Sequence, residues 1–275
     1  MVILITGAKG LLGNYLCKEL EKTHTLVKWN LPEFDITEKD RTIKEIKKVR
    51  PEMIIHLAAF TDVDGCELDK ERAYKTNVIG TWAVVIGALI SEASFLYLST
   101  DYIFDGRKGE PYLEYDEPKP LNFYGKTKLY GERIVNQHID RFFIIRSSGL
   151  YGRGGRNFVD TIIERSEKER ILRVVKDQIV STTYAKDLAL FINRLINTEY
   201  YGIHNFTNSG SCSWYEFAQE IKRIKGLNVE IEPIASSELN RPAKRPIYSV
   251  LRTSPLFEKP RGWREALEEY LIKRL

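Results

Sequence analysis

The feature that most constrains the fold lies at the amino terminus, where a short apolar segment runs directly into closely spaced glycines. Residues 2–5 read Val-Ile-Leu-Ile, which is typical of a parallel strand buried on both faces, and residues 12–21 follow as an amphipathic stretch. Between them, Gly7 permits a tight turn, Gly10 lets the backbone approach a phosphate, and Gly13 lets a helix pack on the strand. The G-x-x-G-x-x-G spacing predicts a dinucleotide-binding turn, with a plain glycine-rich turn as the alternative.

Strand-like and helix-like segments then alternate through the first 150 residues. Apolar strands are expected at 26–29, 53–57, 95–98 and 142–146, and helices at 39–49, 72–91 and 123–137. This alternation predicts βαβ units and therefore an α/β fold of the Rossmann type, with a doubly wound parallel sheet covered by helices. In such sheets ligands bind at the carboxyl ends of the strands.

The character of the sequence changes after residue 150. A glycine-rich loop at 152–157 precedes expected helices at 158–168, 214–225 and 262–275 and an expected strand at 229–231. We expect two parts. One is a dinucleotide-binding domain of residues 1–149, completed by 177–207. The other is a smaller substrate-binding lobe of residues 150–176 and 208–275.

Composition excludes several classes of protein. The 275 residues are 43% hydrophobic and 29% charged, which is typical of a globular protein. We find no apolar run close to the roughly 20 residues of a membrane span, and no signal peptide opens the chain, so no membrane association is expected. The three cysteines, Cys17, Cys66 and Cys212, are odd in number and widely spaced, which favours a reducing, cytoplasmic location.

The charged residues and histidines do not indicate nucleic acid or metal. The net charge is only +4, and the short basic clusters are interleaved with glutamates, as on solvated helix faces. The four histidines are scattered and no Cys-x-x-Cys occurs, so we predict no metal site.

The end of the second expected strand bears on cofactor choice. An acidic residue there would hydrogen-bond the adenosine ribose of NAD, but Trp29 and Asn30 occupy this point. Lys9 and Lys28 are available to meet a 2′-phosphate. The sequence therefore favours NADPH, with NADH as the alternative.

A tyrosine and a lysine four residues apart provide the candidate chemistry. Tyr124 and Lys128 share one face of the expected helix, and Thr100 follows the strand at 95–98. A phenol is a poor acid–base group at neutral pH, and a neighbouring ammonium is expected to lower its pKa. Together the three side chains could polarise a carbonyl and protonate it as hydride arrives from a nicotinamide.

These motifs resemble those of the extended short-chain dehydrogenases/reductases and, within them, the dTDP-4-dehydrorhamnose reductase family. The resemblance covers nearly the whole chain, and the later motifs are its more specific part. The matching segments are residues 6–13, 58–64, 99–106, 120–128, 177–178, 184–189, 207–218 and 241–251.

The resemblance implies a role for each matching residue. The implied catalytic residues are Thr100, Tyr124 and Lys128. Five residues already discussed are expected to contact the cofactor: Gly7, Lys9, Gly13, Tyr124 and Lys128. The resemblance implies further cofactor contacts for Gly10, Leu11, Leu12, Asp35, Ile36, Ala58, Ala59 and Phe60. Substrate contacts are implied for Thr100, Asp101, Tyr102 and Arg241. For Asp35 the alternative is that it only caps the helix that follows Thr37.

One departure from the family leaves the substrate open. Gly149 stands where the family often has a tryptophan that packs on the sugar, so either a neighbour such as Tyr151 supplies the aromatic wall or the substrate differs. Trp214 could be a sugar-stacking platform, but inward packing of its helix is the favoured interpretation.

The resemblance implies reduction of the C4 ketone of dTDP-4-dehydro-L-rhamnose to dTDP-L-rhamnose. Two alternatives stay open: an NADP-binding regulatory subunit of methionine adenosyltransferase, and another epimerase or reductase of nucleotide sugars. Some members of the family form dimers, sometimes with Mg²⁺ near the interface. A homodimer therefore stays open, and no residue here is assigned to a metal.

Overall fold

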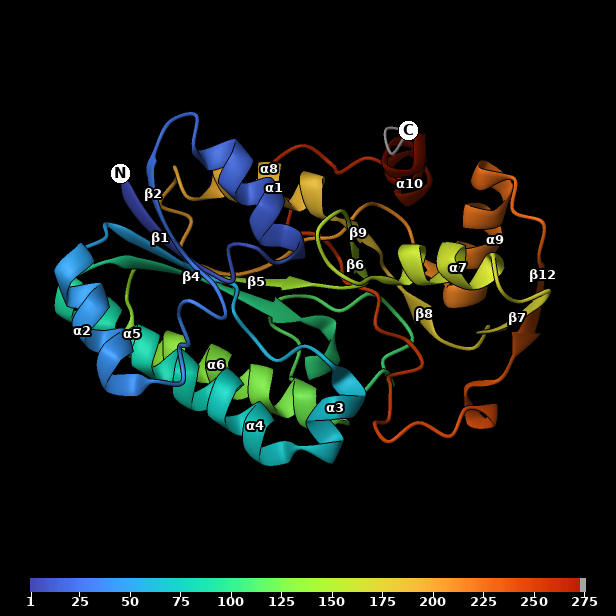
Figure 1. Ribbon diagram of the computed structural model, residues 1–275, viewed down its shortest axis with the longest axis horizontal. Coiled ribbons are helices and arrows are strands. Elements are labelled where there is room, and N and C mark those ends of the chain that lie inside the picture. The colour runs from blue at the N-terminus through green and yellow to red at the C-terminus, as the bar shows by residue number, and fades with distance from the viewer. Residues whose placement is uncertain (273–275) are drawn as a thin grey trace.

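A six-stranded parallel sheet forms the centre of the molecule. The computed structural model describes residues 1–272. In it the strands lie in the order β10-β5-β4-β3-β1-β2 (Figure 1). All five neighbouring pairs are parallel. The strands are β1 (Val2–Thr6), β2 (Thr25–Trp29), β3 (Met53–His56), β4 (Ser94–Thr100), β5 (Phe142–Ser147) and β10 (Gly202–Asn205).

Helices cover both faces of this sheet, because alternate strand residues bury their side chains on opposite sides. Ile3 and Ile5 pack with α1 (Leu11–Leu20) and α8 (Ala185–Leu195) on one face. Leu4 packs on the other face. The helices on that second face are α2 (Lys39–Val49), α5 (Thr81–Ser91) and α6 (Phe123–His138). The result is the α/β, Rossmann-type architecture that the sequence predicts.

The expected helix at 72–91 is longer and less regular than predicted. It comprises α4 (Lys70–Tyr74), a π-helical segment (Lys75–Gly80) and α5. Its 22 residues and a mean hydropathy of 1.3 would suffice for a membrane span by length and composition alone. However, 56% of that stretch is buried inside the protein, as in a core helix.

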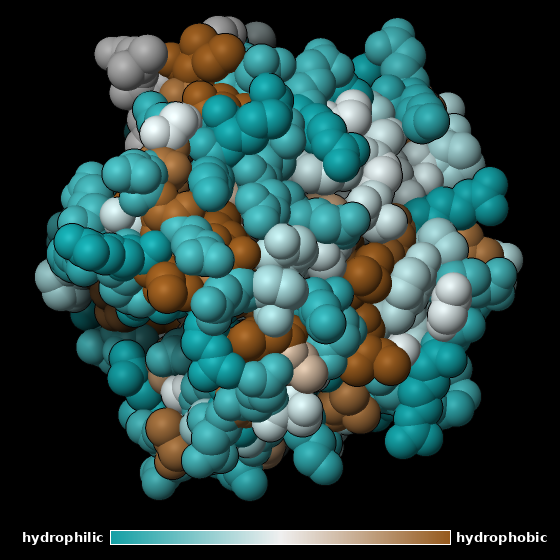
Figure 2. Space-filling view, turned by 90° about the vertical axis from the view of Figure 1, so that its right-hand side faces the viewer, coloured by the Kyte–Doolittle hydropathy of each residue, from teal (hydrophilic) through white to brown (hydrophobic). Residues whose placement is uncertain are grey.

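The smaller lobe is assembled from short strand pairs and three helices. The parallel pair β7 (Ile171–Val175) and β12 (Glu230–Ile234) forms its edge. Its helices are α7 (Phe158–Ser166), α9 (Trp214–Lys225) and α10 (Trp263–Ile272), and they share an apolar core that includes Tyr151 and Phe217. The face of the molecule at this end is mostly hydrophilic, with hydrophobic side chains in small separate groups (Figure 2).

Two other short strand pairs lie between the smaller lobe and the central six-stranded sheet. They are β6 (Leu150–Tyr151) with β9 (Thr183–Tyr184), and β8 (Ile179–Val180) with β11 (Cys212–Ser213). Neither pair was expected from the sequence. Nor were β7, β10, α8 and α3 (Val63–Leu68). The expected strand at 229–231 is β12, and the last three residues of the expected helix at 262–275 lie outside the described residues.

Strand order sets the position of the site. β2 lies on one side of β1 and β3 on the other, so the chain connections diverge between β1 and β3. At such a switch point the loops after the strands separate and leave a crevice at the carboxyl ends.

Candidate active site

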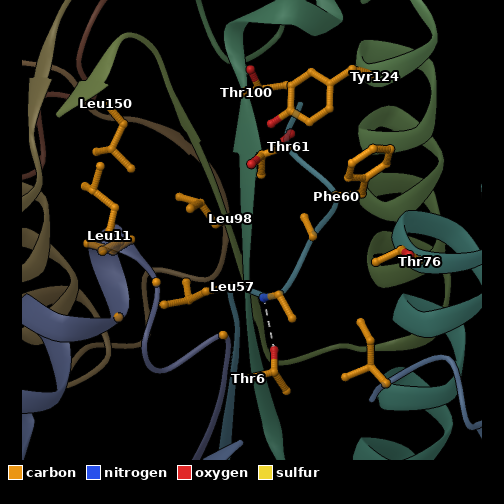
Figure 3. Close-up of a pocket in the computed structure, with 18 of the residues that line it drawn as sticks. Thr6, Leu11, Leu57, Phe60, Thr61, Thr76, Leu98, Thr100, Tyr124 and Leu150 are labelled. Carbon is orange, nitrogen blue, oxygen red and sulfur yellow. Dashed lines mark hydrogen bonds between the residues drawn. The ribbon is translucent and has the colours of Figure 1, made fainter. Parts of the chain in front are cut away.

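A cavity of about 780 Å³ lies at the carboxyl ends of the central strands. Leu11 and Leu150 form one side of it, and Phe60 and Thr76 form the opposite side (Figure 3). Thr100 and Tyr124 lie at one end. Three implied site residues, Lys9, Lys128 and Arg241, are not part of the lining. The other fourteen line it: Gly7, Gly10, Leu11, Leu12, Gly13, Asp35, Ile36, Ala58, Ala59, Phe60, Thr100, Asp101, Tyr102 and Tyr124.

The turn between β1 and α1 has the geometry of an anion site. Gly10 is the N-cap of α1 and no side chain caps this helix, so its first N–H groups face the cavity without a side-chain acceptor. Gly7 has a φ of +71°. A Cβ on Gly13 would lie 2.4 Å from the carbonyl oxygen of Gly7, so only glycine allows this approach of helix and turn.

At the end of β2, an aromatic pair and a polar turn form another part of the wall. Trp29 and Phe34 stack with ring centroids 3.6 Å apart, and both line the cavity. The backbone N–H of Thr37 donates to Asp35 Oδ1 at 2.8 Å. Asp35 therefore closes a local turn and does not cap α2, whose N-cap is Glu38.

The lysines that the sequence suggested for a 2′-phosphate are engaged elsewhere. Lys9 Nζ lies 2.6 Å from Glu33, and Lys28 pairs with Glu21. Neither lysine lines the cavity. The sequence showed only that two lysines lie close to the expected cofactor site. It could not show that Glu33 and Glu21 pair with them, because those contacts depend on how the loops fold.

The start of α6 positions the end of the cavity where the Thr100 and Tyr124 hydroxyls lie. The Asn122 side chain accepts from the Gly125 N–H and donates to the carbonyl of Lys244, both at 2.8 Å. A Cβ on Gly125 would lie 2.1 Å from the carbonyl oxygen of Tyr102, so α6 begins in direct contact with the segment after β4. This packing places Tyr124 beside Thr100.

Burial dominates the electrostatics of Tyr124 and Lys128. Burial raises the pKa of Tyr124, followed in effect by Asp101 and Cys66, whereas hydrogen bonding with Thr100 lowers it. The expectation that the Lys128 ammonium lowers the pKa of Tyr124 stays a prediction. Lys128 Nζ lies 4.0 Å from the centroid of the Tyr97 ring, and burial lowers the pKa of Lys128 to about 7, opposed by Glu132.

Asp101 is a buried carboxyl in the cavity wall. Thr100 Oγ1 donates to its Oδ1 at 3.1 Å. Burial raises its pKa to about 6, while the facing hydroxyls of Ser249 and Ser148 lower it, although neither makes a hydrogen bond of good geometry. Within residues 1–272, Asp101 Oδ2 is a buried oxygen without a hydrogen bond of good geometry, and the Ser249 and Ser148 hydroxyls are its polar neighbours.

Arg241 lies near Tyr102 and Arg245 but is not part of the cavity lining. Burial lowers its pKa, as does the neighbouring cation Arg245. Arg245 makes a bidentate ion pair with Asp64, with distances of 2.8 and 2.7 Å. Arg245 therefore ties this loop to α3.

The aromatic wall expected near residue 149 does not come from Tyr151. That side chain is 1% exposed and stacks on Tyr184 in the core of the smaller lobe. Gly149 has a φ of +54°, and a Cβ there would lie 2.8 Å from the carbonyl oxygen of Ser181. The aromatic side chain of the smaller lobe that does line the cavity is Trp214, so inward packing holds for Phe217 but only partly for Trp214.

Sequence reasoning missed three cations of the lining, Arg72, Lys75 and Arg156. Only the Gly-Arg-Gly-Gly-Arg pattern of residues 152–156 gave a signal, since it puts arginines in a loop able to approach another backbone. In the part of the chain that the structure describes, no group of three or more His, Cys, Asp or Glu side chains is placed to hold a metal.

Comparison with known proteins places this geometry in a family. All 275 residues match the family model described as the RmlD substrate binding domain. The spore coat polysaccharide biosynthesis protein SpsK of Bacillus subtilis is 39% identical, over 99% of this chain and 97% of its own. The dTDP-4-dehydrorhamnose reductase structure from Clostridium acetobutylicum is 40% identical over the whole of both chains, with a TM-score of 0.97.

A second structure was solved with a cofactor. The dTDP-4-dehydrorhamnose reductase of Bacillus anthracis, in complex with NADP, is 38% identical over 99% of both chains, with a TM-score of 0.95. Full-length coverage by the family model and by these relatives agrees with the motifs found along the sequence. The chain belongs to the dTDP-4-dehydrorhamnose reductase family, within the extended short-chain dehydrogenases/reductases.

Proposed function

We propose that this protein is an NADPH-dependent reductase of the C4 ketone of dTDP-4-dehydro-L-rhamnose. The observation that carries the proposal is a single cavity that contains both an anion site and a pair of hydroxyl groups. The uncapped N-terminus of α1 lies on the wall of the cavity, and the Thr100 and Tyr124 hydroxyls lie at one end. The names of the relatives support the nucleotide-sugar substrate and NADP as the cofactor.

The residues of the cavity fit a dinucleotide. The glycine turn allows close approach of a diphosphate, the Trp29–Phe34 pair offers an apolar wall for adenine, and Asn30 leaves the ribose end without a carboxylate. When bound there, NADPH supplies hydride to the ketone carbon. We further expect the protein to act in the cytoplasm.

Tyr124 is the proton donor in this proposal. Its raised pKa keeps the phenol protonated at neutral pH, as an acid for the developing alkoxide requires. Thr100 hydrogen-bonds the same substrate oxygen, and Lys128, one helical turn after Tyr124, stabilises the phenolate that remains. Asp101 lines the same end of the cavity and is the carboxyl group closest in sequence to Thr100, which suits it to bind a sugar hydroxyl.

The test is substrate-dependent oxidation of NADPH, followed at 340 nm, with the 4-keto sugar nucleotide generated in situ. Tyr124→Phe should abolish turnover and retain cofactor binding, whereas Tyr130→Phe, an exposed tyrosine on the same helix, should leave both unchanged. Turnover by Tyr124→Phe at the wild-type rate would refute the role of Tyr124. NADPH binding without any turnover by the wild type would refute the reductase in favour of a regulatory subunit.

A further inference from the structure

The glycine-rich loop of the smaller lobe, residues 152–157, lies directly on the first turns of α1. The Arg153 N–H donates to the Tyr15 hydroxyl at 3.0 Å. A Cβ on Gly155 would lie 3.1 Å from Leu11 Cβ and 3.5 Å from Leu11 N. The loop therefore reaches the helix end whose N–H groups line the cavity.

This loop is held in a defined conformation. Asn157 Nδ2 donates to the carbonyl of Gly152 at 2.9 Å and to that of Gly155 at 3.1 Å. Its Oδ1 accepts from the Asp160 N–H, which caps α7. Gly154 has a φ of +93°, and its Cβ position would lie 2.1 Å from Asn14 Nδ2. Because both ends of the loop are fixed, the side chain between Gly155 and Asn157 has a fixed origin.

That side chain is Arg156, which lines the cavity. Across residues 1–272 it makes no ion pair and no hydrogen bond. Lys9, which lies within the glycine motif itself, is instead neutralised by Glu33. Arg156 is therefore an unpaired cation of the cavity lining, and the preceding Gly155 lies on Leu11, where the N-terminus of α1 attracts an anion.

Two other cations line the cavity, but neither is placed on this turn. Arg72 lies with its guanidinium carbon 4.5 Å from the centroid of the Phe60 ring, and Lys75 precedes Thr76 on the opposite side of the cavity from Leu11. Arg156 differs from both because it follows Gly155 in the loop that lies on Leu11.

We propose that Arg156 binds the diphosphate of the dinucleotide, so that the smaller lobe clamps the cofactor against the N-terminus of α1. A guanidinium makes paired, charge-assisted hydrogen bonds to phosphate oxygens, which the N–H groups of the turn complement from the other side. The inference rests on the proposed cofactor. It makes cofactor affinity depend on a residue outside the dinucleotide-binding motif.

The test measures binding of NADP⁺ and NAD⁺ to the full chain without any sugar nucleotide, by titration calorimetry. Arg156→Ala should weaken binding of both dinucleotides by the same factor, roughly 10- to 100-fold. Arg156→Lys should restore part of the loss, since it returns the charge but not the fork. The matched control is Arg133→Ala, an exposed arginine on α6 outside the cavity lining, which should bind as the wild type does.

Three outcomes would overturn the inference. Wild-type affinity in Arg156→Ala would show that the side chain makes no contact. Loss confined to NADP⁺ would place the side chain on the 2′-phosphate and not on the diphosphate. An equal loss in Arg133→Ala would mean that only overall charge matters. Failure of the proposed cofactor is distinguishable from all three, because the wild type would then bind neither dinucleotide.

Discussion

Replacing Lys128 with methionine tests whether the protein buries a cation beside its cavity. The side chain is 4% exposed, and its pKa falls from 10.5 to about 7. The unfolded chain keeps this proton up to about pH 10.5, so between pH 7 and 10.5 it binds more protons than the folded chain. Raising the pH through this window therefore stabilises the folded state.

The magnitude follows from the size of the shift. At 1.36 kcal/mol per pKa unit, the buried ammonium costs roughly 5 kcal/mol of folding free energy at pH 6 and about 2 kcal/mol at pH 9. Methionine keeps the length of the side chain and its packing on Tyr97, and loses a cation–π contact worth about 0.5–2 kcal/mol. Lys128→Met should thus be more stable than the wild type at pH 6, by a few kcal/mol.

The assay is urea unfolding of the cofactor-free protein at pH 6 and pH 9. The stability advantage of Lys128→Met over the wild type should shrink by about 2–3 kcal/mol from pH 6 to pH 9. Only the wild type gains stability over this range, because only its buried Lys128 can release a proton. Other titrating groups cancel in the comparison. Lys126→Met, an exposed lysine on the same helix, should show no such pH dependence. A variant advantage that stays constant or grows with pH would refute the buried-cation reasoning.

Two other buried charges give further predictions. Burial raises the pKa of Asp101 to about 6, so the charged carboxylate destabilises the folded protein at high pH. Asp101→Asn should therefore stabilise the protein by up to roughly 3 kcal/mol at pH 8 and by almost nothing below pH 4. An equal gain in stability at both pH values, measured by urea unfolding, would contradict this. Glu132→Gln should destabilise by about 3–5 kcal/mol, because it leaves the buried guanidinium of Arg146 without its bidentate partner. The same change in the exposed pair, Glu169→Gln, should cost far less, and similar losses would show that burial does not decide the outcome.

Local patterns in the sequence carried most of the fold. The apolar run at 2–5 followed by Gly7 specifies a strand and a turn within a few residues, so no distant contact is needed to predict β1 and α1. Likewise, Tyr124 and Lys128 share a face of α6 because four residues are close to one helical turn. Such predictions hold wherever the chemistry depends on neighbours along the chain.

Predictions failed where an irregular backbone or a distant partner decides. Tyr151 was expected to be able to face the substrate, but Leu150, which begins β6 directly after the left-handed Gly149, faces the cavity instead. Tyr151 then points into the core of the smaller lobe. Spacing likewise shows that Lys128 is near Tyr124, but not that its ammonium lies over the Tyr97 ring.

Buried ionisable side chains indicate the position of the site independently of the sequence motifs, because a stable interior normally contains apolar side chains. Strands β1, β3 and β4 bury apolar side chains almost completely, yet Asp101 and Lys128 lie buried next to this layer with pKa values shifted in opposite directions. Each shift measures a cost in folding free energy that packing alone would remove. Titratable groups with strongly shifted pKa values cluster at functional sites, and here Asp101 lines the cavity while Lys128 lies one helical turn after Tyr124. The stability that the two substitutions above should recover is therefore the stability that the fold gives up to bury a cation and a carboxyl group near Tyr124, the proton donor in the proposed reaction.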